Sequence, residues 1–287
     1  MLIADLRGPT LRSLTAFVLF AAPPGICSAG DPPVLPPLEI PVLTEADAIQ
    51  VDGDLADWRQ VVGPPTLAMI DMWGDPSESA YCPSTFWIEI WIAVLPPDRM
   101  LVAFERGDDV ISDGMVDVWR DGQFEFMIEV APQEVASDAA TAQRVEVLPF
   151  AEDGLSIRYT GAVGQWRNTA EFIHGVGALD LDEKVTRVEL SLTVFDVVSD
   201  AGPGESVRSD LRIGDAITLA VLAANNNGDG YSSTCYSVIT YPAPPGGARG
   251  LQEDASGFAP AVLVGLEPPP TVVLPSGWGS LKRLLRW

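Results

Sequence analysis

Apolar and polar side chains alternate along four stretches of the chain with a period of two residues. The apolar members are Phe86, Ile88, Ile90, Ile92 and Val94; Phe124, Phe126, Ile128 and Val130; Val188, Leu190, Leu192 and Val194; and Ile217, Leu219, Val221 and Ala223. Successive side chains of a β-strand point to opposite faces, so this alternation predicts strands that each bury one face. A helical period of 3.6 residues is nearly absent, which limits the chain to an all-β fold.

Turn-forming residues separate the predicted strands. They are Pro96-Pro97-Asp98, Asp121-Gly122, Asp153-Gly154 and Gly228-Asp229-Gly230. Many strands of modest length joined by such turns are typical of a sandwich or barrel. The roughly 220 residues from 45 to 265 are enough for one domain with a substantial core. We therefore expect a single immunoglobulin-like antiparallel β-sandwich with proline-rich flanks.

The first 29 residues have the pattern of a secretory signal peptide. Arg7 and Arg12 provide a positive start, residues 14–22 (LTAFVLFAA) a short apolar core, and residues 27–29 small side chains for cleavage after Ala29. The alternative, a buried N-terminal helix, stays open. The signal predicts a protein that is secreted, extracellular or in the cell envelope.

Two cysteines, Cys82 and Cys235, remain after the predicted signal. In an oxidising compartment such a pair is most simply a disulfide. By limiting the conformations of the unfolded chain, it would raise the free energy of unfolding by about 4–5 kcal/mol. Two separate buried thiols are the alternative. Together with the single histidine, they cannot form a zinc site of ordinary ligand count.

Proline-rich segments flank the predicted domain. Residues 30–44 are expected to form a semi-rigid linker, and residues 266–287 a second spacer followed by a basic amphipathic tail. The tail, residues 276–287 (SGWGSLKRLLRW), has three cations, no acid, and apolar residues that could share one helical face. It is predicted either to attach the protein to the envelope or to be a frayed terminus.

The charge balance excludes one large class of partner. The chain has 40 acidic and 17 basic side chains, a formal net charge of −23. Nucleic-acid binding needs clustered Lys and Arg to neutralise phosphates, so no nucleic-acid partner is expected. No segment approaches the roughly 20 apolar residues that a membrane-spanning helix needs.

Several segments resemble, in order, the family 9 carbohydrate-binding modules and the related DOMON-type electron-transfer sandwiches of secreted bacterial proteins. These segments are residues 51–58 (VDGDLADW), 87–104 with the following Asp108-Asp109, 119–128 (WRDGQFEFMI), 189–195 and 217–229. The resemblance covers roughly residues 45–265. It implies a non-catalytic sandwich that binds a polysaccharide or oligosaccharide.

The resemblance also implies which residues contact the sugar. Trp119 would be the stacking platform, and Glu125 and Arg144 would be the partners of the sugar hydroxyls. A flat aromatic ring suits the C–H side of a pyranose, and charged planar groups suit its hydroxyls. The remaining predicted members of the site are Arg120, Asp121 and Tyr231. The alternative for Trp119 is a rim residue that covers the core.

Trp87 and Trp91 form a separate candidate surface. They stand four residues apart on one face of a predicted strand, about 13 Å from each other, with Glu89 between them. They either line a binding surface or belong to a core covered by loops.

The segment Asn225-Asn226-Asn227-Gly228-Asp229-Gly230 is a weak candidate for calcium. Asn225, Asn227 and Asp229 offer oxygen ligands at alternate positions before a glycine. Tyr236 stands where a helix-loop-helix site needs a closing Glu, so either an ordinary turn or partial calcium ligation is expected. The turn Asp52-Gly53-Asp54 has the same two interpretations.

Catalysis has little support in the sequence. His174 is the only histidine, and no nucleophile motif accompanies it. The chain is therefore predicted not to be an enzyme. The first alternative to sugar binding is a structural envelope or surface protein that uses the same sandwich. A weaker alternative is a haem-binding electron-transfer module, with His174 and a methionine such as Met127 as axial ligands.

Overall fold

The computed structural model describes residues 36–44, 49–74, 86–108, 123–130, 142–151, 154–160, 163–226, 236–243, 248–253 and 255–266. The first half of these residues forms β1 (Leu38–Val42), α1 (Ala56–Val61), β2 (Leu67–Ala68), η2 (Met69–Asp71), β3 (Trp73–Gly74), β4 (Phe86–Leu95), β5 (Arg99–Asp108), β6 (Phe124–Glu129), β7 (Gln143–Ala151) and β8 (Gly154–Thr160). The second half forms η3 (Gln165–Arg167), β9 (Ile173–Asp180), β10 (Val185–Thr193), β11 (Phe195–Val197), η4 (Pro203–Glu205), β12 (Val207–Arg208), β13 (Ala216–Asn226), β14 (Tyr236–Tyr241), α2 (Ala248–Glu253), η5 (Ala255–Gly257) and β15 (Ala259–Gly265).

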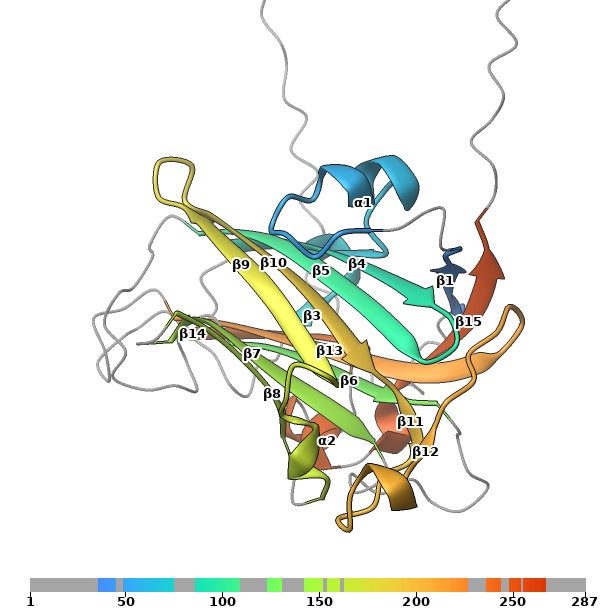
Figure 1. The fold of residues 1–287 in the computed structure, drawn as a ribbon. Coiled ribbons are helices and arrows are strands. Elements are labelled where there is room, and N and C mark those ends of the chain that lie inside the picture. Colours follow the sequence, from blue (N-terminus) through green and yellow to red (C-terminus); the bar gives the residue numbers. More distant parts are fainter. Residues whose placement is uncertain are drawn as a thin grey trace, which may run out of the picture. The chain divides into compact units, whose positions relative to one another are not determined.

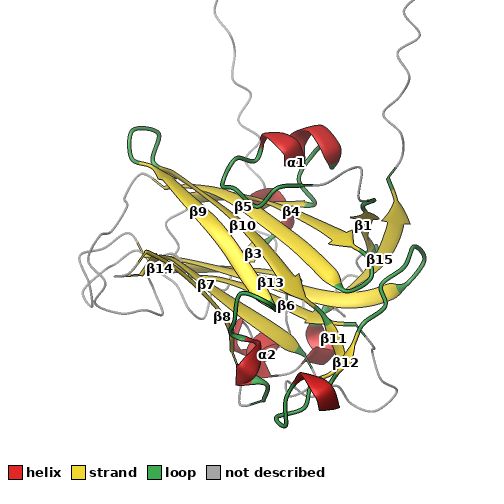
Figure 2. Cartoon of the chain, viewed as in Figure 1, coloured by secondary structure: helices red, strands yellow, loops and turns green. Residues whose placement is uncertain are grey.

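The strands form an all-β sandwich, as the alternation predicts. The hydrogen-bonded order is β8-β7-β6-β13-β15-β1-β4-β5-β10-β9, with β14 beside β13 and β2 beside β4. In space this path makes two layers (Figure 1), one with β9, β10, β5 and β4 and one with β14, β13, β6, β7 and β8. Figure 2 shows how few helical turns accompany the strands. The predicted fold class is therefore confirmed.

The core between the layers is formed by the side chains that the alternation predicts to be buried. Ile88, Ile90, Ile92 and Val94 of β4 meet the equivalent residues of β6, β10 and β13 in one cluster. Each buried aliphatic side chain of this kind contributes about 1.5–3 kcal/mol to folding. This central core is the main source of stability for the two layers.

The layers come together at β8 and β9, the two ends of the strand path, and Gly175 makes this contact close. A Cβ added at Gly175 would lie 2.5 Å from the Ile157 side chain and 2.5 Å from the Glu189 carbonyl oxygen. Only a residue without a side chain allows β8 to approach β9 so closely.

The sequence places the N-terminal boundary of the folded part too late. The predicted linker of residues 30–44 contains β1, whose Ile40 is fully buried. β1 pairs with β15 and β4 in parallel, while the other strand pairs of the described residues are antiparallel. Prolines conceal this strand in the sequence, although Leu38, Ile40 and Val42 alternate within it.

Both layers also carry a small apolar cluster on their outer face. Trp58 of α1 packs against Trp91 of β4 and Leu101 of β5 on one layer. On the other, Leu251 of α2 packs with Met127 of β6 and with residues of β13, β14 and η5. As a result all six residues of β6 are buried, whereas the alternation predicts only one buried face.

Within the described ranges, no helix is long and apolar enough to cross a membrane.

Candidate functional site

A carboxylate lies buried on the outer face of the second layer. Glu125 of β6 has a fully buried side chain, between Glu146 of β7 and Leu222 of β13 in the register of the sheet. Burying a charge is costly unless the group is paired and hydrogen-bonded. The surroundings of Glu125 therefore determine whether it is charged.

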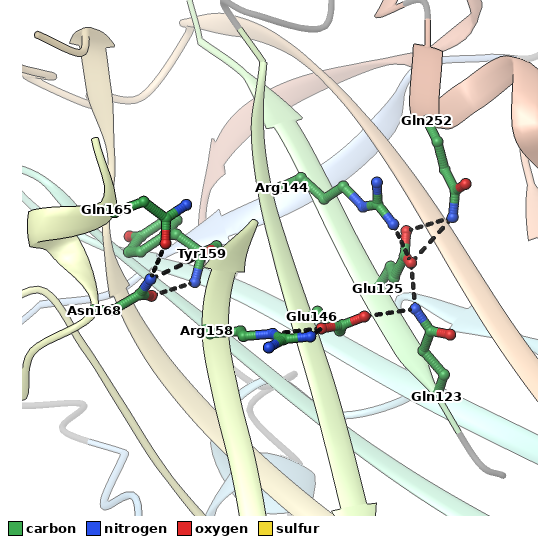
Figure 3. A network of polar contacts seen from close by, with 9 residues as sticks. All are labelled: Gln123, Glu125, Arg144, Glu146, Arg158, Tyr159, Gln165, Asn168 and Gln252. Atoms are coloured by element: carbon green, nitrogen blue, oxygen red, sulfur yellow. Dashed lines mark hydrogen bonds and ion pairs between the residues drawn. The ribbon is translucent and has the colours of Figure 1, made fainter. Parts of the chain in front are cut away.

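Three side chains donate hydrogen bonds to Glu125 (Figure 3). Arg144 Nη2 lies 2.5 Å from Oε1, and Gln252 Nε2 lies 3.0 and 3.1 Å from the two oxygens. Gln123 Nε2 is the third donor. Arg144 comes from β7 and Gln123 directly precedes β6, while Gln252 comes from α2, which covers the face.

A second carboxylate is tied to the first. Gln123 Nε2 also donates to Glu146 Oε1 at 3.0 Å. Arg158 of β8 pairs with Glu146 through two of its nitrogens: Nε lies 2.6 Å and Nη2 lies 2.5 Å from Glu146 Oε2. Two Arg–Glu pairs are thus joined through one amide (Figure 3). We call Gln123, Glu125, Arg144, Glu146, Arg158 and Gln252 the polar row.

Burial dominates the electrostatics of the polar row. Desolvation raises the pKa of Glu125 above its ordinary value, and the charge and hydrogen bond of Arg144, with the hydrogen bond of Gln252, oppose this rise. Arg144 is 22% exposed, and its buried Nε has no hydrogen-bond partner among the described residues. The row therefore combines a fixed acceptor, Glu125, with a guanidinium, that of Arg144, whose Nε–H has no partner among the described residues.

The structure brings together two of the predicted site residues, Glu125 and Arg144. Trp119, Arg120, Asp121 and Tyr231 lie outside the described residues. Sequence reasoning missed the other members of the polar row, namely Gln123, Glu146, Arg158 and Gln252. The alternation places Gln123 on the same face as Glu125, whereas Glu146 and Arg158 lie outside the four alternating stretches, and no signal in the sequence points to Gln252.

The two candidate tryptophans of β4 have different environments. Trp91 is buried in the outer cluster under α1 and donates its indole N–H to the Gly63 carbonyl at 3.1 Å. Trp87 is 38% exposed, and its ring lies over Gly107 of β5, where an added Cβ would come within 2.1 Å of Nε1. The two rings therefore do not form one continuous surface.

The calcium and disulfide predictions rest largely on residues outside the described ranges. The residues outside these ranges include both cysteines of the predicted bridge, Cys82 and Cys235, and two predicted calcium ligands, Asn227 and Asp229. The side chain of the third predicted ligand, Asn225, is also not described. Within the described ranges, no three acidic, His or Cys side chains cluster as metal ligands do.

The turn Asp52-Gly53-Asp54 has a structural use. Asp52 Oδ1 accepts the N–H of Asp54 at 2.9 Å, and Asp54 Oδ1 accepts the N–H of Ala56 at 3.0 Å. Short acidic side chains commonly stabilise turns and helix starts in this way. These two carboxylates therefore fix the entry into α1.

The residues named for a haem pair are not brought together. His174 is exposed on β9, in register with Ser191 of β10. Met127 is buried in the outer cluster of the opposite layer, under α2. Axial ligands must reach one iron from its two sides, and two outer faces of a sandwich do not allow this.

Comparisons with known proteins agree on the fold. No protein-family model matches the chain, and no curated protein matches it. Two solved structures of a family 9 carbohydrate-binding module from Caldicellulosiruptor kristjanssonii do match. The complex with glucose has a TM-score of 0.52 at 9% identity, over 82% of this chain and 100% of the module. The complex with cellotriose has a TM-score of 0.51 at 12% identity, over 83% and 99%. The chain thus has a fold like that of the family 9 carbohydrate-binding modules.

Proposed function

We propose that this chain is an exported, non-catalytic carbohydrate-binding module whose sugar site is centred on Glu125 and Arg144. The observation that carries the proposal is the buried carboxylate of Glu125, held by the guanidinium of Arg144 on the outer face of a sandwich. The fold is shared with modules whose structures contain glucose and cellotriose, which supports a sugar as the ligand.

The chemistry of the pair suits sugar hydroxyls. A guanidinium donates several hydrogen bonds in a fixed plane, and the fully buried carboxylate of Glu125 holds the partly exposed Arg144 in that orientation. Because Glu125 and Arg144 already hold each other, little side-chain entropy is lost when a sugar binds. Trp119 would add a stacking surface from the segment that precedes β6, with Arg120, Asp121 and Tyr231 as further contacts.

The proposal also includes export through residues 1–29, a Cys82–Cys235 bridge, and attachment through residues 276–287. Partial calcium ligation at Asn225, Asn227 and Asp229 belongs to the proposal as well. None of these features is needed for Arg144, positioned by Glu125, to contact a sugar. They can therefore be tested separately.

Calorimetric titration with glucose and cellotriose tests the sugar site. The unmodified chain is expected to bind at least one of them, and Trp119→Ala and Arg144→Ala are expected to weaken this binding tenfold or more. Arg59→Ala is the matched control, because Arg59 makes a similar pair with Glu105 at 2.5 Å on the other layer. Absence of binding to these sugars and to a panel of polysaccharides would overturn the proposal.

The second candidate is a structural envelope or surface protein with the same sandwich. One observation favours it: Gln252 ties α2 to Glu125, so this part of the polar row also holds a helix on the sheet. In that case Trp119→Ala and Arg144→Ala would change only the melting temperature, and no glycan would bind.

A further inference from the structure

We propose that Arg158, positioned by Glu146, is a second sugar contact, so that the site binds a glycan chain running across β6, β7 and β8 and not a single sugar. This inference rests on the proposed function, because it extends the site of Glu125 and Arg144. It assigns a specificity-determining role to an edge strand that the sequence does not single out.

The register places the three residues in one line. Glu125 of β6 is opposite Glu146 of β7, and Glu146 is opposite Arg158 of β8. Neighbouring strands lie about 4.8 Å apart, so the line from β6 to β8 spans roughly 10 Å. That length is comparable with two sugar units of an extended chain and exceeds what one pyranose ring can cover.

Exposure differs sharply within the second pair. The side chain of Arg158 is 53% exposed, whereas that of Glu146 is 3% exposed. The carboxylate therefore cannot contact a large ligand directly. It holds the guanidinium in a fixed position at the surface, where the remaining donors of Arg158 face solvent.

The backbone beside Arg158 is also fixed. Asn168 pairs with Tyr159 of β8 as a strand would, because its Oδ1 accepts the Tyr159 N–H at 2.6 Å and its Nδ2 donates to the Tyr159 carbonyl at 3.1 Å. The same Asn168 Nδ2 also donates a hydrogen bond to Gln165 Oε1 at 2.9 Å (Figure 3). An edge strand fixed in this way presents its arginine with little freedom to lose on binding.

The two contacts are coupled by Gln123. Its amide nitrogen donates to Glu125 and to Glu146, so acceptor oxygens of the two carboxylates lie within about 6 Å of each other. Arg144 and Arg158 are therefore held as two separate donors of one site. A ligand that follows the whole row, from the β6 end to Arg158 on β8, must be longer than one pyranose ring.

Titration of variants with glucose and with cellotriose tests the inference. Arg158→Ala is expected to weaken cellotriose binding about tenfold. Glucose binding, which needs only the contact at Arg144, is expected to stay unchanged. The double variant Glu146→Gln/Arg158→Gln should behave in the same way without leaving a buried carboxylate unpaired, so it serves if Arg158→Ala does not fold. Arg59→Ala is the control, because that arginine is 46% exposed against a 9% exposed Glu105.

The possible failures are distinguishable. If Arg144→Ala abolishes binding of both sugars while both Arg158 variants bind cellotriose normally, the inference is wrong and the proposed function stands. A glucose affinity that falls as much as the cellotriose affinity would also overturn it, because Arg158 would then belong to the first contact. If the unmodified chain binds neither sugar nor any polysaccharide, the proposed function fails and the inference fails with it.

Discussion

The indole nitrogen of Trp58 and the carboxylate of Glu189 are joined by a buried hydrogen bond of 2.6 Å across 131 residues of sequence. The other oxygen of Glu189 accepts the N–H of Asp52 at 2.9 Å and the N–H of Gly53. One carboxylate of β10 thus fixes both the opening turn and α1 on the outer face of the first layer. Two of the segments that resemble family 9 modules are therefore structural partners of each other.

Removing the carboxylate of Glu189 should destabilise the fold strongly. Glu189→Ala leaves the Trp58 indole and two backbone N–H groups without their acceptor, so the free energy of unfolding is expected to fall by about 3 kcal/mol. Trp58→Phe removes only one of these hydrogen bonds and should cost less. Urea unfolding followed by circular dichroism measures both. Equal losses for the two variants would contradict the shared role of Glu189.

The buried Glu125 should make stability depend on pH. Its pKa in the folded protein is raised above 4.5 by burial, so the folded state binds this proton more tightly than the unfolded state does. The contribution is fully present below pH 4.5 and is lost as the pH rises through the raised value. The stability of the unmodified chain relative to Glu125→Gln is therefore expected to fall from pH 4.5 upward. A difference that grows with pH over this range would have the wrong sign.

The position of the exposed Trp87 ring should depend on Gly107. In Gly107→Ala the new methyl group would overlap the indole, so the ring must leave its place on β5. We expect a red shift in Trp87 fluorescence and a stability loss of about 1–3 kcal/mol. The control is Gly204→Ala, where an added Cβ has no neighbour within 4 Å. Unchanged emission in Gly107→Ala would show that the ring does not depend on this glycine.

The contact between β8 and β9 should not tolerate a side chain at position 175. Gly175→Val forces apart Ile157 and the backbone at Glu189, so the free energy of unfolding should fall by about 3 kcal/mol. Gly177→Ala on the same strand meets only the Leu155 side chain at 3.3 Å and should cost much less. Guanidinium unfolding of both variants measures the difference. Similar stability of the two would indicate that the layers can separate freely at this edge.

The alternation of β4, β6, β10 and β13 is local, so the sequence could predict the central core. The burial of Glu125 could not be predicted, because its cover comes from α2. That helix has the sequence ARGLQE, which carries a weak helical signal, and Gln252 lies 127 residues beyond Glu125. The Glu125–Arg144 pair followed from the family resemblance, whereas Glu146 and Arg158 become partners only through the strand register.

The placement of β1 affects how the molecule assembles. β1 is the first of the described strands to be synthesised, yet Leu38–Val42 pairs in register with residues of β15, the last of the described strands. Contacts so distant along the sequence form slowly, because the intervening loop must first be closed. During synthesis β1 therefore lacks this neighbour until residues 259–265 have left the ribosome. A nascent chain cut before residue 259 would keep Ile40 uncovered and be prone to association.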